Sequence, residues 1–159
     1  MVEVVDWGRS LHHNGERPTT VSFTDAELSY LATQRIGRLA TARPDGALQV
    51  NPVSFGYNEE LGTIDIGGYN MAASRKFRNV AAGSRVAFVV DDMPSTDPVR
   101  VRMVEIRGDA EALTDPVDGR AQIGGPIIRI HPRRIISIGL DPGDADRDPH
   151  LLKPFSRSV

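Results

Sequence analysis

The residues best suited to chemistry are concentrated in one stretch, residues 65–79. Gly67 and Gly68 end a short apolar run there, and glycines at such a point let backbone N–H groups approach an anion closely. One hydroxyl and three cationic side chains follow on a predicted helix: Ser74, Arg75, Lys76 and Arg78. Arginine offers forked donors and lysine a compact charge, so the pattern predicts a site that holds a phosphate.

A second interpretation of the same helix stays open. Its cations can form the solvated face of an amphipathic helix whose Met71 and Phe77 pack inward. Spacing alone does not separate the two interpretations.

Polar side chains also occur on a predicted strand that contains a proline. Gln49, Asn51 and Ser54 flank Pro52, and amide groups there can bind the edge of a flat heterocycle. Pro52 cannot donate to a sheet ladder, so this part of the strand is expected at an edge, at a bulge or where another group approaches. The alternative is that these polar residues are outward-facing strand positions.

Positive charge returns in a strand predicted over residues 99–113. It carries Arg100, Arg102 and Arg107, and Arg102 can reach a ligand at a subunit junction. Such arginines also pair with surface carboxylates, and Glu105 and Asp109 are close in the sequence. Both roles stay open.

Other chemistries lack their residues. The chain has no cysteine, which excludes disulfides, thiolate metal sites and cysteine nucleophiles. Its four histidines never take metal-ligand spacing with carboxylates. The sequence contains no nucleophile elbow and no Walker-type phosphate loop. We therefore predict no metal site and no catalytic side chain, and expect a cofactor that brings its own reactivity.

The elements that position these residues begin with one helix and a hairpin. The helix is predicted to start at Thr24, because Thr24 and Glu27 fit a capping box. Residues 36–42 and 47–55 alternate on either side of the Pro44-Asp45-Gly46 turn, which predicts a β-hairpin.

The rest of the chain reads mainly as strands. A third strand, residues 62–66, leads to the two glycines, and Asn70 is expected to cap a helix over residues 71–82. Residues 85–90 are largely apolar and predict a buried central strand. In the next strand the apolar set shifts after Met103, which predicts a bulge or bend.

The last strand is predicted over residues 127–130 and 134–140, interrupted by His131-Pro132. The chain has no alternating strand and helix order. A mainly β fold follows: a six-stranded antiparallel barrel with short helices.

Length and composition fit one soluble globular domain. The chain has 159 residues, of which 40% are hydrophobic and 25% charged. We expect an N-terminal extension over residues 1–22, the barrel over residues 23–140, and a loose polar tail over residues 141–159. The extension has no apolar run, so a cytoplasmic location without membrane attachment is expected. A net charge of −2 and 6% aromatic residues disfavour an oligonucleotide-binding barrel.

The order of these segments resembles the split-barrel flavin-binding family of pyridoxamine 5'-phosphate oxidases and their deazaflavin-dependent actinobacterial relatives. Residues 23–140 carry the resemblance, in stretches 36–53, 74–80, 85–92, 104–108 and 128–134. The resemblance implies a split barrel that forms a homodimer, with a cofactor in the groove between the subunits.

The same resemblance implies roles for individual residues. It implies that five residues face the phosphate: Gly67, Gly68, Ser74, Arg75 and Lys76. Four residues would line the ring: Gln49, Asn51, Pro52 and Val53. The partner chain would supply Val101, Arg102 and Met103.

The implied function is hydride transfer between coenzyme F420 and an unsaturated small-molecule substrate, with FMN as the alternative cofactor. The sequence lacks the C-terminal Arg-Leu-x-Pro signature of true pyridoxamine phosphate oxidases, because Leu140 is followed by Asp-Pro-Gly, so oxidation of vitamin B6 is not expected. Two alternatives stay open: an FMN-dependent oxidoreductase of the pyridoxamine phosphate oxidase type, or a non-catalytic split barrel that binds flavin or haem.

Overall fold

The structure is a computed structural model that describes residues 22–116 and 125–159. The N-terminal extension expected over residues 1–22 lies outside the described residues except for Ser22. Within the described parts, no helix is long and apolar enough to cross a membrane.

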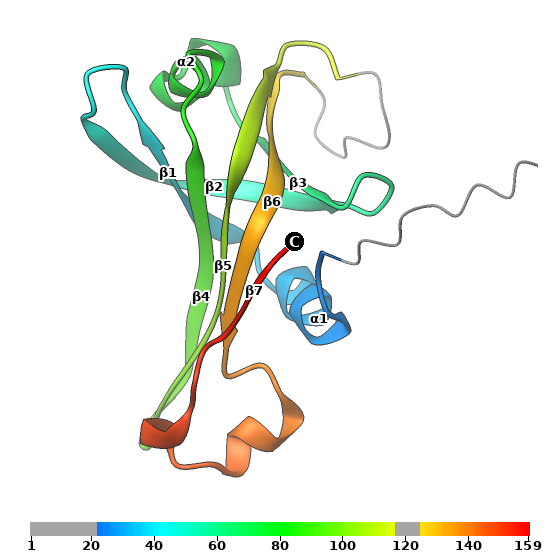
Figure 1. The fold of residues 1–159 in the computed structure, drawn as a ribbon, viewed down its shortest axis with the longest axis vertical. Coiled ribbons are helices and arrows are strands. Elements are labelled where there is room, and N and C mark those ends of the chain that lie inside the picture. Colours follow the sequence, from blue (N-terminus) through cyan, green and yellow to red (C-terminus); the bar gives the residue numbers. More distant parts are fainter. Residues whose placement is uncertain (1–21, 117–124) are drawn as a thin grey trace, which may run out of the picture.

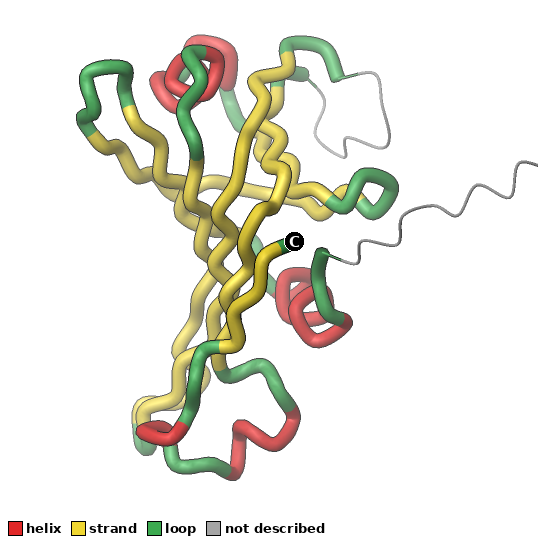
Figure 2. Tube along the Cα trace, viewed as in Figure 1, coloured by secondary structure: helices red, strands yellow, loops and turns green. Residues whose placement is uncertain are grey.

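Seven antiparallel strands form one sheet (Figures 1 and 2). They are β1 (Ile36–Ala42), β2 (Leu48–Asn58), β3 (Thr63–Gly67), β4 (Val86–Thr96), β5 (Val99–Leu113), β6 (Ile127–Ile138) and β7 (Phe155–Ser158). The strand order is β3-β2-β1-β4-β5-β6-β7, and β3 also pairs with β6. The first six strands therefore close into the predicted barrel, and β7 adds a seventh strand outside this closure.

The described residues form two α-helices: α2 (Arg75–Ala81) lies at one end of the sheet, and α1 (Asp25–Thr33) lies beside the sheet, away from α2 (Figure 1). Short 3₁₀ helices η1 (Met71–Ala73), η2 (Pro142–Asp146) and η3 (Pro149–Leu151) complete the described elements. The capping box predicted for α1 is confirmed, since the Thr24 hydroxyl accepts the Glu27 N–H and the Glu27 carboxylate accepts the Thr24 N–H.

The helix predicted over residues 71–82 is two pieces instead. Asn70 adopts a left-handed conformation with φ of 51° and makes no side-chain cap. Ser74 is the N-cap of α2, and its Oγ accepts the Phe77 N–H at 3.2 Å. The single predicted helix is therefore replaced by the short helix η1 and by α2, which are separated at Ser74.

The irregularity predicted in β5 near Met103 lies in the two neighbouring strands, opposite residues 100–102 and 107–108 of β5. The β4–β5 register shifts between Asp92 and Ser95, and the β5–β6 register shifts between Arg107 and Gly108. Even-numbered side chains of β5 face inward along its whole length, and odd-numbered ones face outward. Val99 and Val101 lie on the outer face of β5 and are exposed. Because they are apolar, the sequence looks as if the buried face of the strand changed after Met103.

Strand β6 is continuous through His131-Pro132, where the sequence predicts an interruption of the last strand. Its first half pairs with β3 and its second half with β7, and the register shift opposite Gly108 marks the change. A Cβ on Gly108 would lie 2.0 Å from the His131 carbonyl oxygen, so only glycine fits there. Pro132 is tolerated because it lies beside this bulge.

A buried ion pair supports the closure of the barrel. Asp65 of β3 faces Arg129 of β6, with oxygen to nitrogen distances of 2.8 and 2.9 Å. Both side chains are buried, and the Asn58 amide also donates to Asp65. Around them lies an apolar core that includes Ile64, Phe88 and Ile106. Asp65 therefore serves the fold, although it begins the stretch singled out for chemistry.

The C-terminal residues do not form the expected loose tail. β7 pairs with β6, and Arg157 donates to the carboxylate of Glu27 on α1 at 2.6 and 2.8 Å. Glu27 is 1% exposed and also accepts the Ser137 hydroxyl. Burial by itself would raise the pKa of Glu27, but the hydrogen bonds from Arg157, Thr24 and Ser137 together hold it below its ordinary value. The end of the chain therefore fastens α1 to the sheet.

Candidate cofactor-binding site

The predicted phosphate residues come together at the end of the sheet where α2 lies (Figure 1). Gly67 is the last residue of β3 and pairs with Ser54 of β2, whereas Gly68 is exposed in the following turn. Ser74 caps α2, and Arg75 and Lys76 are its first two residues. We call these five residues, Gly67, Gly68, Ser74, Arg75 and Lys76, the α2 cradle.

The cations of the cradle are free of protein partners. Among the described residues, neither Arg75 nor Lys76 has a hydrogen bond or an ion pair, whereas Arg78 donates to the Ala73 carbonyl oxygen at 2.9 Å. Phe77 and Val80 are buried in the core, so α2 is also the amphipathic helix of the second interpretation. The buried face of α2 packs on the core, and Arg75 and Lys76 remain available to an anion on its exposed side.

The structure places Gln49, Asn51 and Val53 on the inner face of β2. Leu48 and Val50 face outward and are 85% and 64% exposed, so Gln49 and Asn51 are not the outward-facing polar residues of the alternative interpretation. That interpretation is correct for Ser54, which is exposed on the outer face. The Gln49 side-chain oxygen accepts from Asn79 of α2 at 3.4 Å, which ties β2 to the cradle. Asn51 has no side-chain hydrogen bond within the described residues, so its amide is available to a ligand.

Pro52 lies on an open strand edge, which is one of its expected positions. Strand β2 pairs with β1 over residues 48–54, but its pairing with β3 covers only residues 54–58. The first half of β2 therefore has no neighbouring strand on the side from which β3 departs at Gly67. The open backbone edge and the cradle form a corner where a flat ring and its phosphate can both find donors.

The third predicted group lies far from this corner in the same chain. Register runs from Asn51 through Leu39 and Phe88 to Ile106, and Arg102 is a further four residues along β5. Three strand spacings and four residues amount to roughly 20 Å in a flat sheet. Within one chain, Val101, Arg102 and Met103 therefore lie on a different part of the sheet from Asn51 and the α2 cradle.

Arg102 is strongly engaged within the chain. Its guanidinium donates to both carboxylate oxygens of Asp92 at 3.0 and 2.5 Å and lies 5.1 Å from the ring centre of Tyr30. The hydrogen bond from Arg102 lowers the pKa of Asp92, and the same contact raises the pKa of Arg102. Burial and the nearby Asp92 charge raise the pKa of Tyr30. This side chain is held in place by the fold, as the ion-pair alternative anticipated, although its partner is Asp92.

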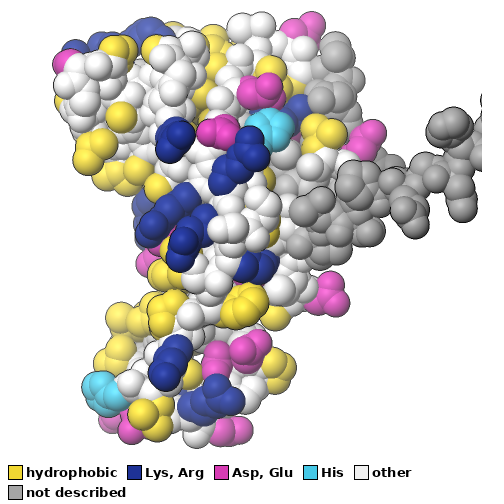
Figure 3. All heavy atoms as spheres, viewed as in Figure 1, with side chains coloured by type: hydrophobic (Ala, Val, Ile, Leu, Met, Phe, Trp, Pro, Cys, Tyr) yellow, Lys and Arg dark blue, Asp and Glu magenta, His cyan; other side chains and the backbone are white. Residues whose placement is uncertain are grey.

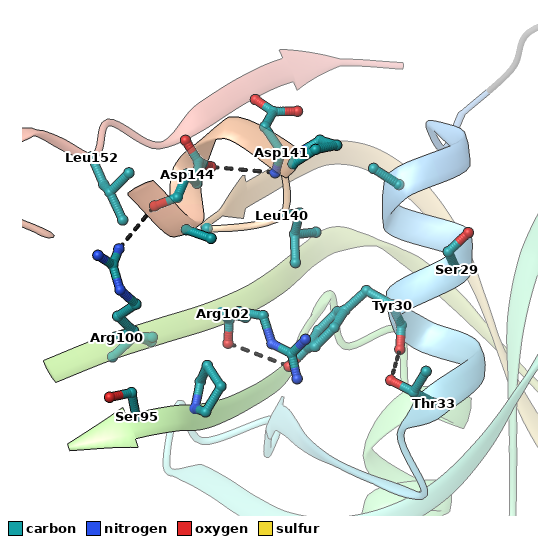
Figure 4. Close-up of a pocket in the computed structure, with 16 residues that line it drawn as sticks. Ser29, Tyr30, Thr33, Ser95, Arg100, Arg102, Leu140, Asp141, Asp144 and Leu152 are labelled. Carbon is teal, nitrogen blue, oxygen red and sulfur yellow. Dashed lines mark hydrogen bonds between the residues drawn. The ribbon is translucent and has the colours of Figure 1, made fainter. Parts of the chain in front are cut away.

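A cavity of about 740 Å³ lies beside this cluster (Figure 4). Its walls come from α1, from the adjoining ends of β4 and β5, and from the chain between Gly139 and Leu152. Val101 and Arg102 line it, but no residue of the α2 cradle does. This cavity could not be predicted from the sequence, because residues of α1, β4, β5 and the chain between Gly139 and Leu152 meet only in the tertiary fold.

Tyr69 and Arg100 are further candidate residues. Tyr69 lies in the turn after Gly68 and is fully exposed, so its ring is free to contact a ligand at the cradle. Arg100 lines the cavity beside α1. The exposed aromatic within a Gly-Gly-Tyr-Asn turn was a signal available in the sequence, whereas the position of Arg100 depends on the tertiary fold.

Among the described residues, no group of three or more His, Cys, Asp or Glu is placed to hold a metal ion. The donors of the cradle corner are cations, amides and backbone groups, which suit a phosphorylated organic cofactor. The absence of a metal site and of catalytic side chains stays a prediction.

The comparisons with known proteins agree with this geometry. Residues 23–138 match the family described as pyridoxamine 5'-phosphate oxidase. A 5a,11a-dehydrotetracycline/5a,11a-dehydrooxytetracycline reductase from Streptomyces rimosus subsp. rimosus is 50% identical over 129 residues, which cover 80% of this chain and 90% of that protein.

Solved structures share the fold at lower identity. A conserved hypothetical protein from Mycobacterium tuberculosis has a TM-score of 0.60 at 22% identity, covering 79% of this chain and 89% of its own. An FAD binding protein from Mycobacterium smegmatis has a TM-score of 0.57 at 20% identity, covering 72% and 93%. With the family match spanning most of the chain and a reductase at 50% identity, this protein belongs to the pyridoxamine 5'-phosphate oxidase family of split-barrel oxidoreductases.

Proposed function

We propose that this protein is an F420-dependent reductase that transfers hydride to an unsaturated, fused-ring small molecule. The observation that carries the proposal is the pair of cations Arg75 and Lys76, without protein partners in the described chain, beside Gly67 and Gly68 and the open edge of β2. Such a corner suits a cofactor with a phosphate and a flat ring.

In this proposal the cradle would bind the phosphate, and Gln49, Asn51, Pro52 and Val53 would line the ring. Val53 is 6% exposed and Pro52 has no N–H, so these two would contribute backbone carbonyls and surface shape rather than side-chain hydrogen bonds. Asn51 would offer its unpaired amide. The bound cofactor would supply the hydride, and the protein would position it and exclude water.

F420 is preferred to FMN because two cations are available. One phosphate can be held by Lys76 with backbone donors, which leaves the more exposed Arg75 for the acidic tail of F420. FMN, which has a single phosphate and no acidic tail, would leave this second charge unused. FMN therefore stays the alternative cofactor.

The substrate class is taken from the relative. That protein is named as a reductase of 5a,11a-dehydrotetracyclines, so we extend the reduction of one carbon–carbon double bond in a fused-ring ketone to this chain. Addition of a hydride to one carbon and a proton to the other completes that reaction. No described side chain is assigned as the proton donor, which leaves water for that role.

The proposal includes a homodimer with the cofactor groove between subunits. Six apolar side chains are exposed on one outer face of the barrel, with Leu48 and Val50 the most open: Ile36, Leu48, Val50, Met93, Val99 and Val101. Figure 3 shows part of this apolar surface in yellow along one margin of the molecule. A second copy covering this face would bury it and would bring Val101, Arg102 and Met103 of one protomer toward the cradle corner of the other.

The test is equilibrium titration of the purified protein with oxidised and reduced F420, FMN and FAD, followed by turnover with a 5a,11a-dehydrotetracycline. We expect the tightest binding for F420 and oxidation of reduced F420 that depends on substrate. Sub-micromolar FMN binding without F420 binding would overturn the cofactor assignment. Cofactor binding without turnover on any fused-ring enone would favour the non-catalytic carrier.

A cytoplasmic location stays part of the prediction.

A further inference from the structure

A cavity lies beside α1, and apart from Val101 and Arg102 its lining belongs to no part of the proposed cofactor site. Its volume of about 740 Å³ lies in the range of ligand pockets. Most of its lining is apolar or small, including Pro94, Leu140 and Leu152. A cavity of this size and polarity suits a ligand of several fused rings better than a small polar metabolite.

One wall of the cavity is flat and rigid. The Tyr30 hydroxyl donates to the Asp92 carboxylate at 3.2 Å and to the Arg102 carbonyl oxygen at 3.3 Å, so its ring cannot turn freely. The Arg102 guanidinium lies over that ring and is held by Asp92. Figure 4 shows Tyr30 and Arg102 side by side across the cavity from Leu152. A planar wall of this kind matches a planar ligand.

Arg100 supplies an uncompensated positive charge. Its Nη1 donates to the carbonyl oxygens of Asp144 and Arg147 at 2.8 and 3.0 Å, which fixes the guanidinium in place. Within the described residues Arg100 has no carboxylate partner, in contrast to Arg102. Its Nε and Nη2 are therefore free to donate to an oxygen of a ligand.

The nearby carboxylates do not cancel this charge. Asp144 pairs with Arg147 at 3.5 Å and accepts the Asp141 N–H. Figure 4 shows the Asp141 carboxylate pointing away from Arg100 and Arg102. The cavity therefore combines apolar walls with one anchored cation, which favours a ligand with an acidic oxygen, such as an ionised enol or phenol.

We propose that the cavity lined by Tyr30, Arg100, Leu140 and Leu152 binds the substrate of the reductase, and that Arg100 holds an anionic enol or phenol oxygen on its fused rings. The identification of this ligand as the substrate rests on the proposed function; the binding of an acidic fused-ring molecule does not. Val101 and Arg102 line the cavity and are also the residues proposed to face the cofactor of the partner subunit, so the substrate would lie beside that ring. Ser29 and Arg100 belong to no part of the proposed cofactor site, so changes at these two residues should alter substrate affinity and leave cofactor affinity the same.

The test uses isothermal titration of the full-length protein with tetracycline, a fused four-ring probe with acidic enols. Ser29 lies on α1 and lines the cavity, so Ser29→Trp fills it. Ala32→Trp is the matched control, because Ala32 is exposed on the same helix and does not line the cavity. We expect the Kd of the probe to rise at least about tenfold in S29W and to stay within about twofold in A32W.

A second pair of variants tests the cation. Arg100→Met should weaken probe binding about tenfold, whereas Arg85→Met, at an exposed arginine outside the cavity, should leave it unchanged. Arg100→Lys keeps the charge and should recover part of the affinity. Unchanged affinity in S29W, or no measurable binding of tetracycline to the unaltered protein, would overturn the proposal.

The outcome is separable from that of the proposed function. The Kd for F420 should be the same in S29W, in R100M and in the unaltered protein, while the KM for the fused-ring substrate rises. Failure of the unaltered protein to bind F420 or FMN would contradict the proposed function and leave the tetracycline measurement valid. Turnover that is insensitive to S29W would contradict only the substrate site.

Discussion

The charged residues around α1 and those at the start of α2 differ in whether they have protein partners. Around α1, Glu27 is buried and held by Arg157 and Ser137, and Arg102 is held by Asp92. At the start of α2, Arg75 and Lys76 have no partner in the described chain. Charges that are paired and buried maintain shape, because losing one partner leaves the other desolvated. Charges that are unpaired and hydrated contribute little to stability and are available to a ligand.

The largest expected effect tests the charged residues around α1. Arg157→Met leaves the Glu27 carboxylate buried without its bidentate partner, so we expect a loss of about 3 kcal/mol in the free energy of unfolding. The measurement is chemical denaturation at pH 7. Arg133→Met is the control, because Arg133 pairs with Asp109 at a similar distance of 2.8 Å but both side chains are more than half exposed. That change should cost less than about 1 kcal/mol.

Equal losses in the two variants would contradict the distinction between buried and exposed pairs. A loss in R157M confined to the C-terminal strand, visible as fast amide exchange there with normal global stability, would show that β7 does not fasten α1.

A second prediction concerns the apolar face that extends beside the cradle. Val50 is 64% exposed, so Val50→Arg should leave the monomer as stable as before. Placed in a dimer interface, the same arginine would be desolvated without a partner, and the dimer dissociation constant should rise at least about a hundredfold. Sedimentation equilibrium measures this directly. A dimer of unchanged affinity would exclude this face as the subunit interface.

Much of the fold could be predicted from the sequence because its signals are local. The Thr24 and Glu27 capping box and the Pro44-Asp45-Gly46 turn each depend on residues within one turn of chain, and the structure confirms both. β7 was missed because residues 155–158 have neither the length nor the alternation of a strand. Their pairing depends on β6 and on the contact of Arg157 with Glu27, far away in the sequence.

The candidate site likewise has one part whose residues are close in the sequence and one part whose residues meet only in the tertiary fold. The cradle could be located from its glycines and cations, because its five residues lie within ten positions of one another. The cavity beside α1 could not, since Tyr30, Arg100 and Leu152 meet only through tertiary packing. The shift near Met103 was misread as a bulge within β5, because exposed apolar residues such as Val99 and Val101 look like core residues in a pattern of hydrophobicity.

A third prediction uses pH to isolate the Glu27 charge. Its pKa in the folded protein lies below the ordinary value of 4.5, so the ionised form stabilises the fold above that pH. The stability advantage of the unaltered protein over Glu27→Gln should be constant from pH 7 to about pH 5 and shrink as the pH falls through the lowered pKa. The part that disappears should be about 1.4 kcal/mol for each unit by which the pKa is lowered. An advantage that is independent of pH would show that hydrogen bonding, and not charge, fastens α1.

The smallest expected effect tests the start of α2. Lys76→Ala removes a cation that no described residue uses, so the free energy of unfolding should change by less than about 0.5 kcal/mol. If Lys76 contacts the cofactor phosphate, the Kd for F420 should rise about tenfold, which is the loss of one charge-assisted hydrogen bond.

Arg85→Ala is the matched control, since Arg85 is also exposed and without an ion pair in the described chain but lies after α2 rather than at its start. A rise in Kd for K76A alone would assign the cradle to the cofactor. The same Kd in both variants would return Arg75 and Lys76 to the solvated face of an amphipathic helix. The difference between the residues around α1 and those of α2 would then be only that the former have protein partners and the latter are solvated, and it would indicate no ligand.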